Sequence, residues 1–207
     1  EICIITNPSE SKLYKKLLGT GSQIGCKFEF LEQEKPYGIP DVLNYAKQVY
    51  GNTPLTLMLG DNIFAANENL INLMRNKKIS GAKIFATMVD DPKRFGIVSF
   101  DKKMRIKELE EKPLNPKSNY AVIGLYIFDE KVFDYLKYLK PSKRGELEII
   151  DLLQMYLNDE MLSLEIIRRG SIWFDAGTPD SLLRASLFVE TFEKQSVQKI
   201  INSIYSS

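Results

Sequence analysis

The sequence lacks histidine entirely among its 207 residues. Histidine is the side chain that most often serves as a general base, a metal ligand or a pH-sensitive switch. Its absence excludes enzymes built on a Ser-His-Asp or a Cys-His arrangement. Any catalytic acid, base or ligand must therefore be a carboxylate, a lysine, a hydroxyl group or a bound ion.

Cysteine is almost as scarce, with Cys3 and Cys26 as its two positions. Both lie in apolar, strand-like segments, and they have neither Cys-x-x-Cys spacing nor a histidine partner. This pattern favours neither a zinc site nor a disulfide framework. We expect two buried free thiols in a reducing cytoplasm.

An excess of one charge and a long apolar run are also missing. The 28 Lys and Arg residues nearly balance the 27 Asp and Glu residues, so no overall basic field attracts nucleic acid or an anionic membrane. No stretch approaches the roughly 18 consecutive apolar residues of a membrane helix, and no secretory leader is recognisable. We expect a cytoplasmic protein with neither a nucleic-acid nor a membrane partner.

What the sequence does contain is an alternation of short apolar runs and amphipathic segments. Ser9 or Ser11 is expected to cap the first helix, which Gly19 ends, and Asp41 is expected to cap the second. Strands are predicted at residues 2–6, 27–31, 55–59, 83–89, 96–100, 105–111, 120–128, 162–168 and 172–174. Further helices are predicted at residues 70–76, 132–139, 148–157 and 179–201.

This order of elements predicts an α/β fold. Strand and helix alternate up to about residue 89, which is typical of a Rossmann-like, doubly wound and mostly parallel sheet. The denser strands after residue 96 predict a mixed extension of the same sheet. No linker, internal repeat or low-complexity segment interrupts the chain, so residues 1–207 are expected to form one domain.

Two aspartates follow apolar strands at glycine turns. Asp61 stands between Gly60 and Asn62, and Asp175 precedes Ala176-Gly177. In open α/β sheets ligands bind beyond the carboxyl ends of the strands, so the two carboxylates could share one divalent cation that also contacts phosphate. The alternative for each aspartate is an ordinary turn or helix cap.

Other polar residues at strand and loop ends allow both a functional and a structural interpretation. Lys112 could direct its charge at a phosphate or belong to a solvated run of charges. The amide of Gln33 could pair with a pyrimidine edge or simply lie in a loop. Arg144 could bind a ligand or help to cap the following helix. Asn119 enters a strand in which Gly124 would let a sugar pack close to the backbone.

Taken in order, these segments resemble the glucose-1-phosphate thymidylyltransferase family of sugar nucleotidyltransferases. The resemblance spans the chain up to about residue 193. It rests on Gln33 with Pro36 and Gly38, and on the segments at residues 59–64, 91–98, 110–113, 117–122, 144–149 and 173–178. It implies that the phosphate oxygen of glucose 1-phosphate attacks the α-phosphorus of dTTP and that pyrophosphate leaves.

The resemblance also implies roles for single residues at the nucleotide end of the site. Gln33 and Gly38 would read the thymine, and Pro36 would pack in the same pocket. Asp61 would contact the nucleotide and, together with Asp175, would hold Mg²⁺. Because this chemistry depends more on positioning and charge neutralisation than on a proton shuttle, a chain without histidine can perform it.

At the sugar-phosphate end the resemblance implies two catalytic cations. Lys112 would contact the sugar phosphate and Arg144 would lie close to it. The residues implied to line the glucose pocket are Gly96, Glu111, Asn119 and Val122. The family also assembles as tetramers, which implies a homo-oligomer.

The sequence departs from the family at three places. Phe95 stands where tyrosine is common, and Ile150 stands where threonine is usual. The family's glycine-rich loop, which follows its first strand and cradles the triphosphate, is not found in these residues. We expect it to precede Glu1, so the strands at 2–6 and 55–59 should flank the place of an absent first strand, and residues 1–207 alone should be inactive.

Two alternatives remain open. One is a uridylyl- or cytidylyltransferase of the same fold, because Gln33 fits a uracil edge as well as a thymine edge. The other is a non-catalytic sugar-nucleotide sensor or regulatory subunit. An NAD-binding dehydrogenase is disfavoured because no Gly-x-Gly-x-x-Gly segment follows a predicted strand.

Overall fold

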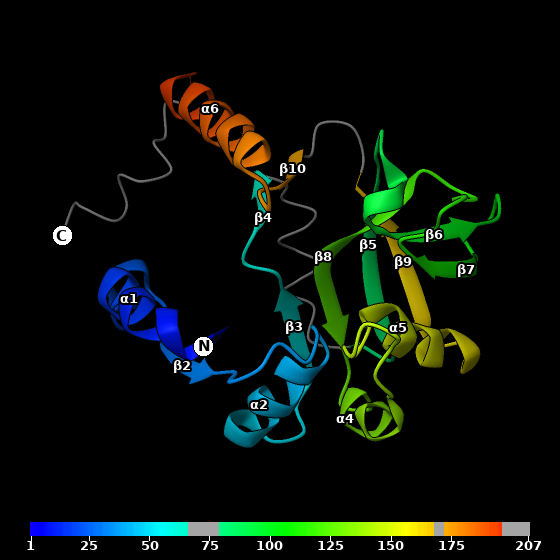
Figure 1. The fold of residues 1–207 in the computed structure, drawn as a ribbon, viewed down its shortest axis with the longest axis horizontal. Helices are drawn as coiled ribbons and strands as arrows, with labels where there is room; N and C mark the ends of the chain where they lie inside the picture. Colours follow the sequence, from blue (N-terminus) through cyan, green and yellow to red (C-terminus); the bar gives the residue numbers. More distant parts are fainter. Residues whose placement is uncertain (66–78, 168–171, 196–207) are drawn as a thin grey trace.

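A computed structural model of the chain describes residues 1–65, 79–167 and 172–195 (Figure 1). The helix predicted at residues 70–76 lies outside these ranges, as do the last residue of the strand predicted at 162–168 and the end of the helix predicted at 179–201. Of the helices described, none is long and apolar enough to cross a membrane.

The first part of the chain alternates strand and helix as predicted and then adds a short strand that was not predicted. Its elements are β1 (Ile2–Thr6), α1 (Pro8–Leu18), β2 (Phe28–Glu32), α2 (Asp41–Tyr50), β3 (Leu55–Met58) and β4 (Asn62–Ala65). The later elements are β5 (Ala82–Met88), β6 (Gly96–Phe100), β7 (Ile106–Glu111), β8 (Tyr120–Phe128), α4 (Val132–Tyr135), α5 (Ile149–Asn158), β9 (Leu162–Ile166), β10 (Ile172–Asp175) and α6 (Pro179–Gln195).

The main sheet has six strands of mixed direction. Its order is β7-β6-β8-β5-β9, and β3 pairs with β8 beside that path. The pairings orient β3, β5, β6 and β9 in one direction and β7 and β8 in the other. The prediction of a mixed α/β sheet is confirmed. Because β8 lies between β3 and β5, however, antiparallel pairs outnumber parallel ones in this sheet.

The first two strands form a sheet of their own. β1 pairs with β2 in parallel register, Ile4 opposite Phe30, whereas β3 belongs to the main sheet. The α1, β1 and β2 unit stands apart from the main sheet in Figure 1. Within the described residues β1 and β3 share no pairing. That these two strands flank the place of another strand stays a prediction.

Two helix starts differ from the prediction. Asn7, rather than Ser9 or Ser11, caps α1: its side-chain Oδ1 accepts a hydrogen bond from the Glu10 N–H at 3.1 Å. The cap followed by Pro8 at the first helical position is a common start signal. Asp41 does not cap α2 but is its first helical residue. Gly19 ends α1 as predicted.

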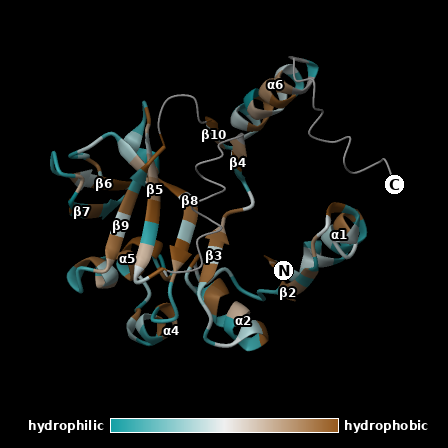
Figure 2. Cartoon of the chain, turned by 180° about the vertical axis from the view of Figure 1, so that it is seen from behind, coloured by the Kyte–Doolittle hydropathy of each residue, from teal (hydrophilic) through white to brown (hydrophobic). Residues whose placement is uncertain are grey.

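The hydrophobic core lies around β8 and the neighbouring strands. Tyr156 of α5 packs with Phe128 of β8, their ring centroids 5.8 Å apart, and both side chains are fully buried. Figure 2 shows hydrophobic colouring on the central strands and mixed colouring on the outer helices. This core fixes the strand ends that carry the polar residues described next. Cys3 and Cys26 are free, as expected, but they are only partly buried, which differs from the expectation.

Candidate active site

A cavity of about 240 Å³ opens where strands β4, β6, β7, β8 and β10 approach the start of α5. It brings together residues that are far apart in the sequence. Six of the predicted site residues line it, namely Asp61, Gly96, Glu111, Lys112, Val122 and Asp175.

The two aspartates meet because β4 and β10 pair. Asp61 directly precedes β4 and Asp175 ends β10, where it stands opposite Asn62 in antiparallel register. The Ala176 N–H donates to the backbone carbonyl of Asp61 at 2.7 Å, which continues the pairing beyond the strands. Two short strands more than 100 residues apart in the sequence thus place both carboxylates at one edge of the cavity.

The geometry at Gly177 brings oxygens of the two carboxylates to one place. A Cβ atom built on Gly177 would lie 3.0 Å from Asp175 Oδ1 and 3.3 Å from Asp61 Oδ2, so both oxygens border the same small space, and Asp175 Oδ1 also accepts the Gly177 N–H at 3.1 Å. No cluster of three or more Asp, Glu or Cys side chains is found in the described ranges. A pair of carboxylates suits Mg²⁺, which usually takes its other ligands from water and substrate phosphates.

Lys112 sits at the end of β7 in an unusual backbone conformation. Its φ of +43° lies in the left-handed region, which non-glycine residues rarely adopt. Its N–H donates to the Phe95 carbonyl at 3.1 Å, and its Nζ lies 3.9 Å from Glu111 Oε1. Such strain persists only where the surroundings enforce it, and it is concentrated at functional sites.

Arg144, in the loop before α5, lies at the rim of the cavity, where it meets Glu111 of the cavity wall. Its Nη2 lies 2.7 Å from Glu148 Oε2 and 3.7 Å from Glu111 Oε1, so it links the helix start to the end of β7. Ser142 Oγ also donates to Glu148, at 2.6 Å. The guanidinium is therefore held on one side by Glu148, while about half of its side-chain surface stays exposed.

The two glutamates of this group have opposite pKa shifts. Burial raises the pKa of Glu111, and the charges of Lys112 and Arg144 only partly offset it. Burial also acts to raise the pKa of Glu148, but hydrogen bonds from Arg144 and Ser142 outweigh it and leave that pKa lowered. Glu148 is thus the firmly ionised partner of Arg144.

The residues predicted to read the base lie in the loop before α2, next to the cavity rather than in its wall. Gln33 Nε2 donates to Asp41 Oδ2 at 2.8 Å, and Pro36 is exposed. Gly38 has a φ of +103°, and a Cβ atom built on it would lie 2.1 Å from the Leu147 carbonyl oxygen. Gly38 therefore packs this loop directly against the segment that carries Arg144.

The sequence matches the family model described as "Nucleotidyl transferase" over residues 1–191. The chain belongs to the nucleotidyl transferase family. The transferase is 41% identical over 201 residues to the glucose-1-phosphate thymidylyltransferase of Neisseria gonorrhoeae, which covers 97% of this chain and 69% of that protein. It is 42% identical over 200 residues to the enzyme of that name from Mycolicibacterium smegmatis, with the same coverage.

Solved structures place the fold of the transferase in the same group. A Bacillus anthracis protein assigned as a glucose-1-phosphate thymidylyltransferase, crystallised with sucrose, superimposes with a TM-score of 0.81 at 41% identity over 91% of this chain and 75% of that one. A UDP-glucose pyrophosphorylase crystallised with UDP-glucose superimposes with a TM-score of 0.75 at 20% identity, over 91% of this chain and 80% of its own. At that identity the second similarity bears on the fold alone.

Asn119 does not join the other predicted residues of the transferase. It is exposed and lines a separate depression with Met88, Phe100 and Lys117. Its carbonyl accepts the Val89 N–H at 2.9 Å, which extends the pairing of β5 with β8. A contact between Asn119 and the sugar stays a prediction.

Arg94 is a site residue to which the sequence analysis assigned no role. Its Nη2 lies 3.6 Å from Asp175 Oδ2, and its guanidinium lies 5.5 Å from the centre of the Phe95 ring. The segment at 91–98 supported the family resemblance, but its sequence gives no sign that Arg94 would meet an aspartate 81 positions later. Arg94 places a cation beside one of the two carboxylates that face the cavity.

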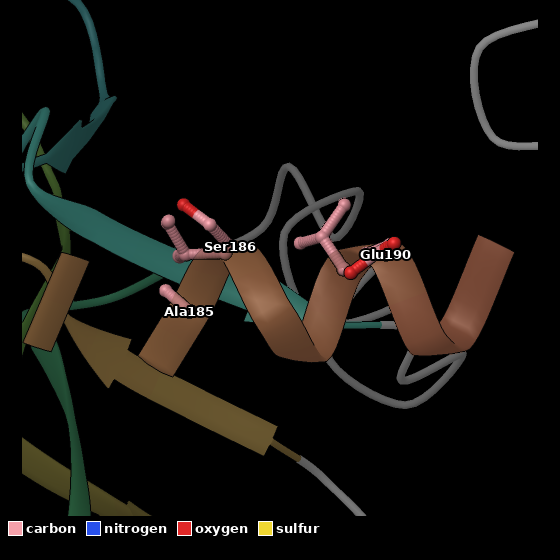
Figure 3. A pocket seen from close by; sticks show the side chains of 5 residues that line it. Ala185, Ser186 and Glu190 are labelled. Carbon is pink, nitrogen blue, oxygen red and sulfur yellow. The ribbon is translucent and has the colours of Figure 1, made fainter. Parts of the chain in front are cut away.

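A further cavity of about 350 Å³ is lined by residues of α6 and by Ile63 of β4. Figure 3 shows Ala185, Ser186 and Glu190 on the α6 side. Among the described residues that line the cavity, Glu190 is the one that carries a charge, and it pairs with Lys194 at 2.5 Å. Ser186 Oγ, also in the wall, donates to the Leu182 carbonyl at 2.8 Å. These polar groups are already partnered within α6, so this cavity does not compete with the first as a candidate active site.

Proposed function

We propose that this nucleotidyl transferase couples dTTP and glucose 1-phosphate to form dTDP-glucose and pyrophosphate, with Mg²⁺ as its cation. The observation that carries the proposal is the meeting of Asp61, Asp175 and Lys112 in one cavity, with Arg144 at its rim. The two relatives named above carry the same activity in their names. Paired carboxylates beside two cations are suited to phosphates rather than to neutral substrates.

The proposed reaction balances without a proton shuttle. A phosphate oxygen of glucose 1-phosphate forms a bond to the α-phosphorus of dTTP, and the bond from that phosphorus to the oxygen bridging to the β-phosphate breaks. The electron pair leaves with pyrophosphate. Catalysis then consists of holding the two anions in line and neutralising their charge, which requires no histidine.

Lys112 and Arg144 are the proposed catalytic cations. We assign the sugar phosphate to Lys112, because its ammonium is a compact charge on a rigidly held backbone. Arg144, oriented by Glu148, approaches the same phosphate from the other wall. We assign the glucose hydroxyl groups to the surroundings of Gly96 and Glu111, where the carboxylate accepts hydrogen bonds. The Ile150 side chain packs against Gly96, because its Cδ1 would lie 2.8 Å from a Cβ atom built on the glycine.

Asp61 and Asp175 are the proposed Mg²⁺ ligands. When bound there, the cation would neutralise the phosphate charge that builds up as the new bond forms. When no metal ion is bound, the positive charge of Arg94 offsets the negative charge of Asp175. This limits the electrostatic repulsion between Asp61 and Asp175.

At the nucleotide end we assign the thymine to Gln33, Pro36 and Gly38. Gln33 donates a hydrogen bond from Nε2 to Asp41, so its side-chain carbonyl oxygen is the atom that would accept the N–H of a thymine or uracil ring. Base discrimination between dTTP and UTP must therefore come from other residues. We also propose that the protein is cytoplasmic, folds as one domain and works as a homo-oligomer, in keeping with the family resemblance.

The test uses the protein expressed from its complete reading frame, with Asp61→Asn and Asp175→Asn measured separately. Each variant should keep the fold but lose several kcal/mol of transition-state stabilisation, which is measured as a lower turnover of dTTP with glucose 1-phosphate. Asp134→Asn is the matched control, because that exposed aspartate pairs with Lys137 away from the cavity. Turnover near that of the control in either variant would remove its aspartate from the metal site. Equal or faster turnover of UTP would replace the proposed substrate with a uridine nucleotide.

A further inference from the structure

Strand β8 has a gap in one of its two edges. β5 pairs along one edge, whereas β6 and β3 share the other, with β6 opposite Ala121 and β3 opposite residues 125–128. Gly124 lies where these two neighbours separate. Its carbonyl accepts the Leu59 N–H at 2.9 Å, but none of the described strands supplies an acceptor for its own N–H.

The side chain of Asn62 fills this gap. Asn62 is 7% exposed, and its Oδ1 accepts the Gly124 N–H at 3.0 Å and the Trp173 Nε1–H at 2.6 Å. Its Nδ2 donates to Asp61 Oδ1 at 2.7 Å. Because two donors meet the same oxygen, the orientation of the amide is determined, and its NH₂ group must face Asp61.

Gly124 is the residue that admits this amide. A Cβ atom built on Gly124 would lie 2.8 Å from Cγ, Oδ1 and Nδ2 of Asn62. A real Cβ does not approach other atoms so closely, so alanine at 124 would displace the carboxamide. The glycine in the middle of this otherwise apolar strand thus has a packing reason that concerns Asn62.

We propose that Asn62 is the positioning residue for the divalent cation, an inference that rests on the proposed function. Its NH₂ group donates to Asp61 Oδ1, which leaves Oδ2 beside Gly177 as the oxygen nearer to Asp175 Oδ1; the latter accepts the Gly177 N–H at 3.1 Å and keeps a second lone pair for a cation. Its Oδ1 ties this arrangement to β8 through Gly124 and to β10 through Trp173. Asn62 itself contributes no ligand; it sets which oxygen of Asp61 the cation meets.

The protein carries its own reporter for this arrangement. Trp173 is the single tryptophan of the sequence, and its ring lies 5.8 Å from that of Phe95 at the cavity wall. The indole N–H depends on Asn62 for its acceptor. Tryptophan emission therefore reports whether the Asn62 amide is in place, with no substrate turnover needed.

The experiment compares Asn62→Ala and Gly124→Ala with Ile123→Val, which trims the buried residue next to Gly124 on β8. Because Ile123 belongs to the cluster against which Trp173 packs, this variant is the control for metal binding and not for emission. Binding of Mn²⁺ alone is measured by the paramagnetic resonance signal of the free ion, and tryptophan emission is recorded for each protein. Partners that orient metal ligands typically change metal affinity by about 10–100-fold. We expect a loss of that size, with shifted emission, in both alanine variants, and wild-type Mn²⁺ affinity in Ile123→Val.

A matching split is expected in the kinetics. The Mg²⁺ concentration for half-maximal rate should rise in both alanine variants, and in Asn62→Ala the KM for glucose 1-phosphate should stay unchanged. Trp173→Phe removes one hydrogen-bond donor to Asn62 and keeps an aromatic ring at that place. It should therefore weaken Mn²⁺ binding as well, and it tests the role of Asn62 if an alanine variant does not fold.

The outcomes separate this inference from the proposed function. Wild-type Mn²⁺ affinity in the folded variants would overturn the role of Asn62, even if the protein makes dTDP-glucose. If the variants lose Mn²⁺ affinity but the wild-type protein transfers no nucleotide, the proposed function fails and the positioning role stands. Equal weakening in Ile123→Val would reduce the effect to general loosening of β8 and would also overturn the inference.

Discussion

Gly38→Ala is the substitution whose cost can be worked out most directly from the structure. The residue has a φ of +103°, and the new methyl group would lie 2.1 Å from the carbonyl oxygen and 2.8 Å from the nitrogen of Leu147. Both atoms belong to the backbone and cannot rotate away as a side chain would. The Leu147 N–H also donates to the Tyr37 carbonyl at 2.7 Å, and this bond must break if the two segments separate.

Three contributions add to the expected cost. A left-handed backbone costs alanine about 1–2 kcal/mol, and overpacking costs about 1–3 kcal/mol. Loss of the hydrogen bond between Leu147 and Tyr37 adds about 1 kcal/mol, which makes a total of about 3–6 kcal/mol. Since a domain is stable by only about 5–15 kcal/mol, Gly38→Ala should remove a large part of the free energy of unfolding.

Gly25→Ala is the matched control. Gly25 has a φ of +68°, and a methyl group built on it meets no atom within 4 Å. It should therefore cost only the backbone contribution of about 1–2 kcal/mol. The reduced freedom of the unfolded chain is the same in both variants and cancels between them.

Urea-induced unfolding, followed by the fluorescence of Trp173 and by circular dichroism, measures both variants. With equal denaturant slopes, the difference between the midpoints gives the difference in free energy of unfolding. We expect Gly38→Ala to be less stable than Gly25→Ala by at least about 2 kcal/mol. Equal destabilisation by the two substitutions would refute the close packing of Gly38 on Leu147.

Three further predictions concern the cavity and the loop beside it. Lys112→Ala should raise the KM for glucose 1-phosphate more than the KM for dTTP in steady-state kinetics; equal effects would place Lys112 on the nucleotide. Gln33→Ala should weaken calorimetric binding of dTTP and UTP alike by about 1–3 kcal/mol, and unchanged dTTP binding would leave the loop as a mere connection. Burial raises the pKa of Glu111, so ionising this residue destabilises the folded protein. The destabilisation begins as pH rises through the usual pKa of an unfolded glutamate, about 4.3, and is complete above the raised pKa of the folded state. Glu111→Gln should thus raise the melting temperature at neutral pH and leave it unchanged at pH 3 or so, whereas a pH-independent gain would contradict this cause.

Strands with a strong local pattern were predictable from the sequence. β8 and β6 have the predicted bounds, since continuous apolar runs mark strands that are buried on both faces. β4 was missed. Its four residues follow Gly60-Asp61, which indicates a turn, and its stability depends on pairing with β10 more than 100 residues later. No local pattern carries that information.

The candidate site divides in the same way. Asp61, Asp175 and Lys112 could be predicted because each stands at the end or just outside of a strand, where α/β proteins bind ligands. The roles of Arg94 and Asn62 depend on which side chains meet them after folding. Asn62 contacts Trp173, which lies 111 positions later in the sequence. From the sequence alone, a function in this turn could be assigned to Asp61 but not to Asn62.

The central place of β8 also has a consequence for the order in which the protein can fold during synthesis. β3 and β5 do not pair with each other in the described structure; both wait for β8, which lies between them. β3 ends at Met58 and β8 ends at Phe128, so a ribosome adding about 5–20 residues per second leaves β3 without its partner for several seconds. Through that interval the apolar face of β3 and its unpaired edge are open to solvent, which makes the nascent chain prone to aggregation until β8 emerges.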